Sequence, residues 1–257
     1  MTFSQDEVER YARHLVLREI GGPGQQRLKA ARVLIVGAGG LGAPAALYLA
    51  AAGVGHIGLA DPDVVALSNL QRQVLYAAAD VGRPKVEAAA QALAALNPEI
   101  AVTPIAQALT PANAGALVRP YDLVLDGTDD FATRFAVNAA CLEQHKPLVS
   151  GAIGRWSGQV GVFAAGLTRR RPLAERQPCY RCLVSEIPPD AETCSAVGVV
   201  GALAGVVGSM MALEAIKWIV GAGHTLGGRL WLYDALDGES RTVRLSADPE
   251  CPACGDA

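Results

Sequence analysis

Four of the six cysteines form two Cys-x-x-Cys pairs, Cys179 with Cys182 and Cys251 with Cys254. Two such pairs can supply four thiolates to a tetrahedral metal ion, and Zn²⁺ is the usual occupant. Because the interval between the pairs is longer than in a compact zinc ribbon, the metal would hold the C-terminal segment against an internal loop. A four-thiolate site leaves no open coordination position. The sequence therefore predicts one structural zinc ion per chain, with free or redox-active thiols as the alternative.

A glycine-rich turn indicates a nucleotide. Gly37, Gly39 and Gly42 form a Gly-x-Gly-x-x-Gly pattern between an apolar, strand-like run and a helix-like segment. Glycines at this spacing allow a tight turn and a close approach of phosphate groups to a helix N-terminus. Asp61 ends the next strand-like run, where a carboxylate can bind ribose hydroxyls. By themselves these features fit an NAD-dependent oxidoreductase as well as other nucleotide-binding proteins.

Asn69, Arg72 and Lys85 bring one amide and two cations just beyond the ribose carboxylate. The helix N-terminus already serves the pyrophosphate of a dinucleotide. A triphosphate carries more charge, and cations also stabilise a departing pyrophosphate. Singly, Arg72 and Lys85 could be solvated helix-surface charges. Their order around one edge of the sheet favours ATP.

Another strand-like run ends with three aspartates, Asp126, Asp129 and Asp130. Ligands of open α/β sheets bind at the carboxyl ends of the strands, and a carboxylate there suits Mg²⁺. Asp129 or Asp130 could instead cap the helix expected at 131–140. Together with the cations, the aspartates favour a triphosphate with Mg²⁺.

Two cysteines lie outside the pairs. Cys141 falls on an apolar helical stretch and is predicted to pack in the core. Cys194 precedes a long apolar helix, whose N-terminus would lower the pKa of a thiol. It is the one candidate nucleophile, and a thiol without a chemical task is the equal alternative.

Alternating strand and helix patterns predict an α/β fold with a doubly wound, mostly parallel, Rossmann-like sheet. Ser4 and Glu7 form a capping box for a first helix, expected to run to about Arg18 and to break in the GGPG run at 21–24. Further elements follow in order: strands at 32–37, 56–61, 100–105 and 121–127, and helices from 42, at 85–96, at 111–118 and at 131–140.

The second half changes character and becomes rich in loops. Strands are expected at 146–152 and 158–165, then a loop rich in Pro and Arg, an apolar helix and a final strand pair within 229–245. One domain over 1–257 is the simplest organisation, with an N-terminal helix at 4–18, a nucleotide-binding half at 30–150 and a zinc-stapled half at 151–257.

Composition excludes several classes of protein. Hydrophobic residues make up 51% of the chain and charged residues 18%, which is typical of a folded α/β protein. A net charge of −3 argues against a broad basic surface for nucleic acid or anionic membranes. The uncharged run at 196–213 is near the lower limit for a membrane span, but it is rich in Ala and Gly, so a helix in the core or in a subunit interface is expected. The first residues lack the pattern of a signal peptide, so the cytoplasm is expected.

Several motifs together resemble the MoeB/ThiF/HesA family, the bacterial relatives of ubiquitin-activating enzymes. The resemblance runs from about residue 8 to 255, and the combination of SNLQRQ with two Cys-x-x-Cys pairs is highly specific. The other matching motifs are RYARHLVL, RVLIVGAGGLG, LADPDVVALSNLQRQ, VGRPKVEAA, LVLDGTDD, TCSAVGV and SMMALEAIKW.

The resemblance implies adenylation of the C-terminal glycine of a ubiquitin-like sulfur carrier with a Gly-Gly end, using MgATP and releasing pyrophosphate. The activated carrier then receives sulfur for molybdopterin, thiamine or thiolated-tRNA synthesis. Matching positions imply adenine-nucleotide contacts by Gly40 and Asp61. Phosphate contacts are implied for Ser68, Asn69, Leu70, Gln71, Arg72 and Lys85.

In the same family, Asp129 matches the Mg²⁺ carboxylate and the four paired cysteines match the structural zinc ligands. Arg13 matches an arginine that reaches the triphosphate from the other subunit of a homodimer. Cys194 matches a cysteine that bonds to the carrier in ThiF-like members and is not required for adenylation in MoeB-like members.

Two departures from the family pattern follow. Asp130 stands where the family commonly has Asn, which alters the charge balance around Mg²⁺. The sequence shows no rhodanese sulfur-transfer segment, so a separate sulfur donor is expected, and the second half would bind the carrier.

The alternatives are an NAD-dependent oxidoreductase, supported only by the glycine pattern and Asp61, and a non-catalytic module that senses a nucleotide.

Overall fold

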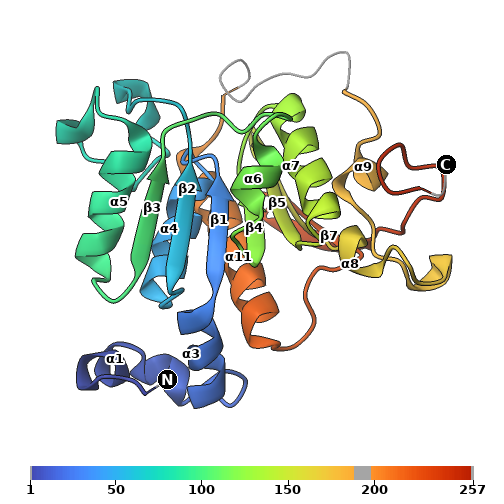
Figure 1. Ribbon diagram of the computed structural model, residues 1–257. Coiled ribbons are helices and arrows are strands. Elements are labelled where there is room, and N and C mark those ends of the chain that lie inside the picture. The colour runs from blue at the N-terminus through green and yellow to red at the C-terminus, as the bar shows by residue number, and fades with distance from the viewer. Residues whose placement is uncertain (1, 188–197, 256–257) are drawn as a thin grey trace.

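The sheet is the frame of the molecule. The structure is a computed structural model that describes residues 2–187 and 198–255. Within these residues, eight strands form one sheet in the order β3-β2-β1-β4-β5-β6-β7-β8 (Figure 1). The parallel strands are β1 (Arg32–Val36), β2 (His56–Ala60), β3 (Ala101–Ile105), β4 (Leu123–Asp126) and β5 (Leu148–Gly154), and the antiparallel strands are β6 (Ser157–Phe163), β7 (Arg229–Asp234) and β8 (Glu239–Arg244). This confirms the predicted mostly parallel, Rossmann-like sheet.

Helices cover both faces of the sheet, because strand residues alternate between two apolar clusters. Val33 and Ile35 of β1 pack in one cluster with α4 (Gly42–Ala51), α5 (Lys85–Leu96) and α11 (Gly201–Val220). Leu34 and Val36 face the other, with α6 (Ala114–Val118) and α7 (Phe131–Glu143). The remaining elements are short: α8 (Ala165–Thr168), α9 (Tyr180–Leu183), and the 3-10 turns η1 (Leu67–Asn69), η2 (Ala78–Asp80) and η3 (Leu173–Glu175).

The N-terminal segment differs from the prediction of one helix over 4–18. The capping box is present, since the Glu7 amide donates to Ser4 Oγ and Glu7 accepts from the Ser4 amide, but α1 (Gln5–Arg10) ends at Tyr11. The Tyr11 ring is buried and its hydroxyl accepts a 2.9 Å hydrogen bond from Asn97 Nδ2. A non-helical backbone at Tyr11 separates α1 from α2 (Ala12–Leu15). Tertiary packing here outweighs local helix propensity.

The GGPG run was predicted to break a helix, and that prediction is wrong. Gly21, Gly22, Pro23 and Gly24 are the first four residues of α3 (Gly21–Ala30). Proline is tolerated there because the first backbone N–H groups of a helix have no intrahelical acceptor. Gly24 is buried, and a Cβ atom on it would lie 2.9 Å from Ile20 Cγ2, so the small residue also permits close packing.

The long apolar helix α11 is a core helix. It is long and apolar enough to cross a membrane by composition alone, yet half of its apolar window is buried inside the fold. Leu203, Val207 and Met211 on one of its faces pack in the main cluster, against the sheet. It therefore covers β5 and β6 and extends to α3 and α4. This confirms the expectation of a core helix.

Candidate functional site

A pocket of about 430 Å³ opens at the carboxyl edge of the sheet, beyond the ends of β1, β2 and β4. Successive strands are added on one side of β1 up to β3 and on its other side from β4 onward, so the order of the sheet reverses between β1 and β4. Ligands of open α/β sheets bind at such a switch point. The pocket gathers most of the residues predicted for nucleotide binding: Gly40, Asp61, Asn69, Arg72, Lys85, Asp129 and Asp130.

The glycine turn forms the floor of this pocket, and buried hydrogen bonds fix it. Gly37 has φ +89°, a backbone conformation that favours glycine. The Ala38 amide donates to Asp61 Oδ2 at 2.8 Å, and the Tyr76 hydroxyl donates to the Ala38 carbonyl at 2.7 Å. Burial, and then the nearby Asp61 carboxylate, raise the pKa of Tyr76, so its hydroxyl remains a donor. Asp61 therefore holds the turn as well as facing the pocket.

Two cations, Lys85 and Arg72, line the same pocket as Asp61. Lys85 is the first residue of α5 and is only 5% exposed; its Nζ lies 2.8 Å from Asp63 Oδ2 and 3.7 Å from Asp61 Oδ1. Arg72 is partly exposed, and its Nη1 donates to the Ser68 carbonyl at 3.1 Å. Both side chains line the pocket, so the cationic wall expected for a triphosphate is present.

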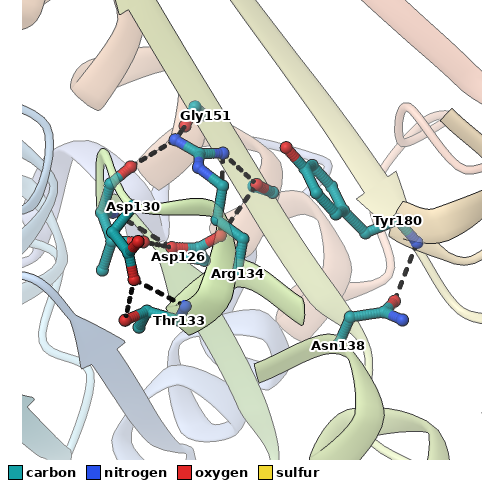
Figure 2. Close-up of polar contacts among 9 residues, drawn as sticks. Asp126, Asp130, Thr133, Arg134, Asn138, Gly151 and Tyr180 are labelled. Atoms are coloured by element: carbon teal, nitrogen blue, oxygen red, sulfur yellow. Dashed lines mark hydrogen bonds and ion pairs between the residues drawn. The ribbon is translucent and has the colours of Figure 1, made fainter. Parts of the chain in front are cut away.

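The three aspartates after β4 have three different environments. Asp126 is fully buried, and its Oδ1 accepts hydrogen bonds from the Thr128 amide and hydroxyl. Asp130 is the N-cap of α7 and accepts from the amides of Ala132 and Thr133 (Figure 2). Hydrogen bonding, first from the Thr133 side chain, lowers the pKa of Asp130. Asp130 therefore caps α7, which is the alternative that the sequence left open, and it also lines the pocket.

Asp129 is the carboxylate of this loop that is presented to the pocket. It is exposed, it lines the pocket, and within residues 2–187 and 198–255 it makes no hydrogen bond. A carboxylate at this edge that makes no hydrogen bond with the described part of the chain is suited to a hard cation such as Mg²⁺.

Some predicted residues lie away from the pocket. Ser68, Leu70 and Gln71 do not line it: Leu70 packs against the main core, and the other two are exposed. Arg13 lies on α2 and does not line the pocket. Figure 1 shows α1 and α3, the helices before and after α2 in the chain, at the amino ends of the parallel strands. Cys194 lies outside the described residues.

The pocket also contains residues that sequence reasoning missed, among them Gln73, Arg134 and Tyr180. Gln73 is 3% exposed, and its Oε1 has no hydrogen-bond partner in the described part of the chain. Arg134 was detectable, because it shares a helix face with Val137, Asn138 and Cys141, and a cation on a buried face needs a partner. Cys141 itself is buried, as predicted, and burial raises the pKa of its thiol.

The paired cysteines converge into one cluster. Their four Sγ atoms all lie within 4.8 Å of one another, with 3.6 Å between Cys179 and Cys251 and 3.4 Å between Cys182 and Cys254. Metal–sulfur bonds of about 2.3 Å in a tetrahedron place sulfurs roughly 3.8 Å apart, so the cluster has the dimensions of a four-thiolate metal site. The cysteines are not joined by disulfides. The cluster brings the segment around α9 next to the C-terminal segment, as predicted for a metal that holds the two together.

The fold and the pocket define a nucleotide-binding α/β protein with a cationic wall, a separate acidic loop and a four-cysteine cluster. Comparison with known proteins then identifies its family. Residues 11–253 match the ThiF family, and the chain belongs to it.

Relatives with established names agree with this assignment. The chain is 47% identical to the sulfur carrier protein adenylyltransferase of Thermus thermophilus, covering 100% of this chain and 94% of the relative. It is 46% identical to the molybdopterin-synthase adenylyltransferase of Escherichia coli, covering 98% of each. It is 50% identical to the bovine adenylyltransferase and sulfurtransferase MOCS3 over 98% of this chain, and spans about half, 54%, of that longer protein.

A solved structure shows the same fold at lower identity. The crystal structure of E. coli MccB with MccA-N7isoASN is 22% identical, with a TM-score of 0.83 over 99% of this chain and 76% of that one. At this identity, the likeness supports the fold alone.

Proposed function

We propose that this chain adenylates the C-terminal glycine of a ubiquitin-like sulfur carrier protein, using ATP and releasing pyrophosphate. One observation carries the proposal: a single pocket brings together the glycine turn, Asp61, the cations Arg72 and Lys85, and the exposed Asp129. A hydride-transfer enzyme needs the first two features and has no use for the others. The relatives named as adenylyltransferases support the same activity.

For this reaction the protein has to position the two substrates and neutralise the charge of the phosphates. The carboxylate of the carrier attacks the α-phosphorus in line, and pyrophosphate leaves from the opposite side, so no general base is required. Asp61 would accept hydrogen bonds from the ribose, and the turn at 37–42 would face the phosphates with its backbone amides. Arg72, with Asn69 beside it, would stabilise the charge that develops on the departing pyrophosphate.

Lys85 differs from a freely reaching phosphate ligand. The Lys85 side chain is buried, and its ammonium group already pairs with the Asp63 carboxylate and lies near that of Asp61. A triphosphate entering the pocket would share this ammonium with the two carboxylates. We expect Lys85 both to order the Asp61 carboxylate and to contribute positive charge to the phosphate site.

Mg²⁺ fits the acidic loop. Asp129 would hold the ion, which would supply positive charge to neutralise the phosphates. Asp130, committed to the α7 cap, would add negative charge nearby without being free to turn toward the ion. Zn²⁺ fits the four-cysteine cluster, where its role would be structural because all four coordination positions are filled.

The remaining partners belong to the same proposal. Arg13 does not line the pocket of its own chain, so its proposed contact with the triphosphate would come from the other subunit of a homodimer. A separate sulfur donor and a covalent role for Cys194 rest on the family resemblance, and a cytoplasmic location is proposed alongside them. Relatives that are named for molybdopterin synthase and for a sulfur carrier leave the individual carrier open.

Pyrophosphate–ATP exchange with a cognate carrier tests the assignment of residues. Arg72→Ala and Asp129→Ala should each nearly abolish exchange, because one removes the leaving-group cation and the other the Mg²⁺ carboxylate. Near-normal rates in both variants would refute the proposed site. Tight NADH binding would instead favour the oxidoreductase, and ATP binding without turnover in the presence of every carrier would favour the sensing module.

A further inference from the structure

The position of Asp129 is set by its neighbours. The residue lies in the short loop between β4 and α7, and its own carboxylate makes no hydrogen bond in the described parts of the chain. Asp126 anchors the start of this loop through Thr128, and Asp130 anchors its end through the α7 cap. The backbone between the two anchors must still be held for Asp129 to face the pocket.

Arg134 holds that backbone from inside the molecule. It is 4% exposed, and its Nη2 donates to the carbonyl of Thr128 in the loop and, at 2.8 Å, to the carbonyl of Gly151 in β5 (Figure 2). Its Nη1 donates to Ser150 Oγ at 3.1 Å and lies 3.7 Å from Asp126 Oδ2. One planar group therefore joins the end of β4 and the middle of β5 to the residue just before Asp129.

The guanidinium keeps its charge in this buried place. Burial is the largest single influence and opposes the charge, but Asp126, Tyr180 and Asp129 together outweigh it, so the pKa of Arg134 is raised. Tyr180 covers the group on another side, with Arg134 Cζ 5.7 Å from the centre of its ring. The Tyr180 amide donates to Asn138 Oδ1 at 2.8 Å, and Tyr180 directly follows Cys179 of the cysteine cluster (Figure 2).

We propose that Arg134 is a positioning residue, which acts through the backbone of Thr128 to hold Asp129 where it binds the metal ion of MgATP. Ser150 orients the guanidinium, and Tyr180 shields it from water while tying it to the segment that carries Cys179 and Cys182. The inference rests on the proposed function, because it assigns a role at the same nucleotide site.

Affinities for ATP with and without Mg²⁺ separate positioning from a merely structural role. Arg134→Lys keeps the charge and loses the planar fork. Loss of a group that orients a metal ligand typically costs about 10–100-fold in metal affinity. We expect the advantage of MgATP over metal-free ATP, measured by titration calorimetry, to fall by that factor, while metal-free ATP binds within about twofold of the wild type.

A double-mutant cycle identifies the residue through which Arg134 acts. Asp129→Asn alone should remove the MgATP advantage, and Arg134→Lys with Asp129→Asn should bind no more weakly than Asp129→Asn alone. Additive losses, a parallel loss of both affinities, or unchanged MgATP binding would overturn the proposal. Arg32→Lys is the control, because Arg32 also lies over a tyrosine ring and donates to a carbonyl, and it is the exposed first residue of β1, at the amino ends of the parallel strands.

Folding is monitored independently by thermal melting and metal content. If Arg134→Lys does not fold, Ser150→Ala decides the question, because it removes one acceptor of the guanidinium and leaves the arginine in place. It should reduce the MgATP advantage in the same direction by a smaller factor, and an unchanged advantage would refute the proposal. Pyrophosphate exchange by the wild-type protein is measured in parallel: its absence with every carrier would refute the proposed function alone.

Discussion

Gly42 tests how the glycine turn is held. A Cβ atom at this position would lie 1.8 Å from the carbonyl oxygen of Gly37, whereas real Cβ atoms essentially never approach closer than 3.0 Å. In Gly42→Ala, the carbonyl must therefore move by about 1.2 Å, which is enough to stretch an ordinary hydrogen bond beyond its useful range.

The bonds at risk are buried. The Gly37 amide donates to Ala60 at 2.8 Å, and the Ala38 amide donates to Asp61 Oδ2 at 2.8 Å. Leaving one buried partner unsatisfied costs about 1–3 kcal/mol, and overpacking alone costs a similar amount. We expect Gly42→Ala to lose about 3 kcal/mol of unfolding free energy and to bind ATP at least about tenfold more weakly, because its phosphate-facing amides are displaced.

Urea denaturation and ATP titration measure the two effects. Gly22→Ala is the control: a Cβ atom on Gly22 meets nothing within 4 Å, and the residue lies in the first turn of α3. That substitution should leave ATP binding unchanged and should not lower stability. Wild-type stability and ATP affinity in Gly42→Ala would refute the role assigned to the turn.

Two further predictions concern Asp130 and the cysteine cluster. Asp130→Asn should retain the α7 cap, whereas Asp130→Ala should lose about 1 kcal/mol by urea denaturation near pH 7. The pKa of Asp130 is lowered in the folded state, so its charge stabilises the fold above pH 3.8, and this stabilisation is lost as the pH falls through the folded-state pKa. The loss of unfolding free energy in Asp130→Ala should therefore shrink on acidification, and a loss that grows would contradict this. Removal of the bound metal with a chelator should lower the melting temperature by roughly 10 °C, since a cross-link that closes so long a loop restrains the unfolded chain by about 4 kcal/mol. Restoration by Zn²⁺ is the check, and a metal-free preparation that melts like the untreated protein would contradict a structural role.

Local sequence patterns correctly predicted the helices and strands that depend on neighbouring residues in the chain. The helix at 85–96 begins and ends as expected because its Ala-rich run follows Pro84, and the buried strands were visible as apolar runs. Asp61 and the group of Asp126, Asp129 and Asp130 were predicted from their positions at strand ends, since parallel strands bring their carboxyl ends to one edge. The choice of Asp129 within that group came from the family resemblance. The cysteine cluster followed from spacing alone.

Tertiary contacts decided what the sequence did not show. The break at Tyr11 depends on a ring buried against Asn97, far along the chain, and the helical start at GGPG depends on packing around Gly24. The bond between Lys85 and Asp63 was hidden because the two residues lie 22 positions apart, and the path of the loop with η1 and η2 brings them together. Arg134 shows the same limit: its helix was predicted, but its acceptors come from β4, β5 and the loop.

The most direct test of the central claim is pyrophosphate–ATP exchange by the wild-type protein, with and without a panel of carriers that end in Gly-Gly. Adenylation predicts exchange that depends on one carrier, accompanied by a mass increase of one adenylyl group on that carrier. Exchange restricted to one carrier would also name the pathway. No exchange with any carrier, from protein that binds ATP and retains its metal, would contradict the claim and favour a nucleotide-sensing module.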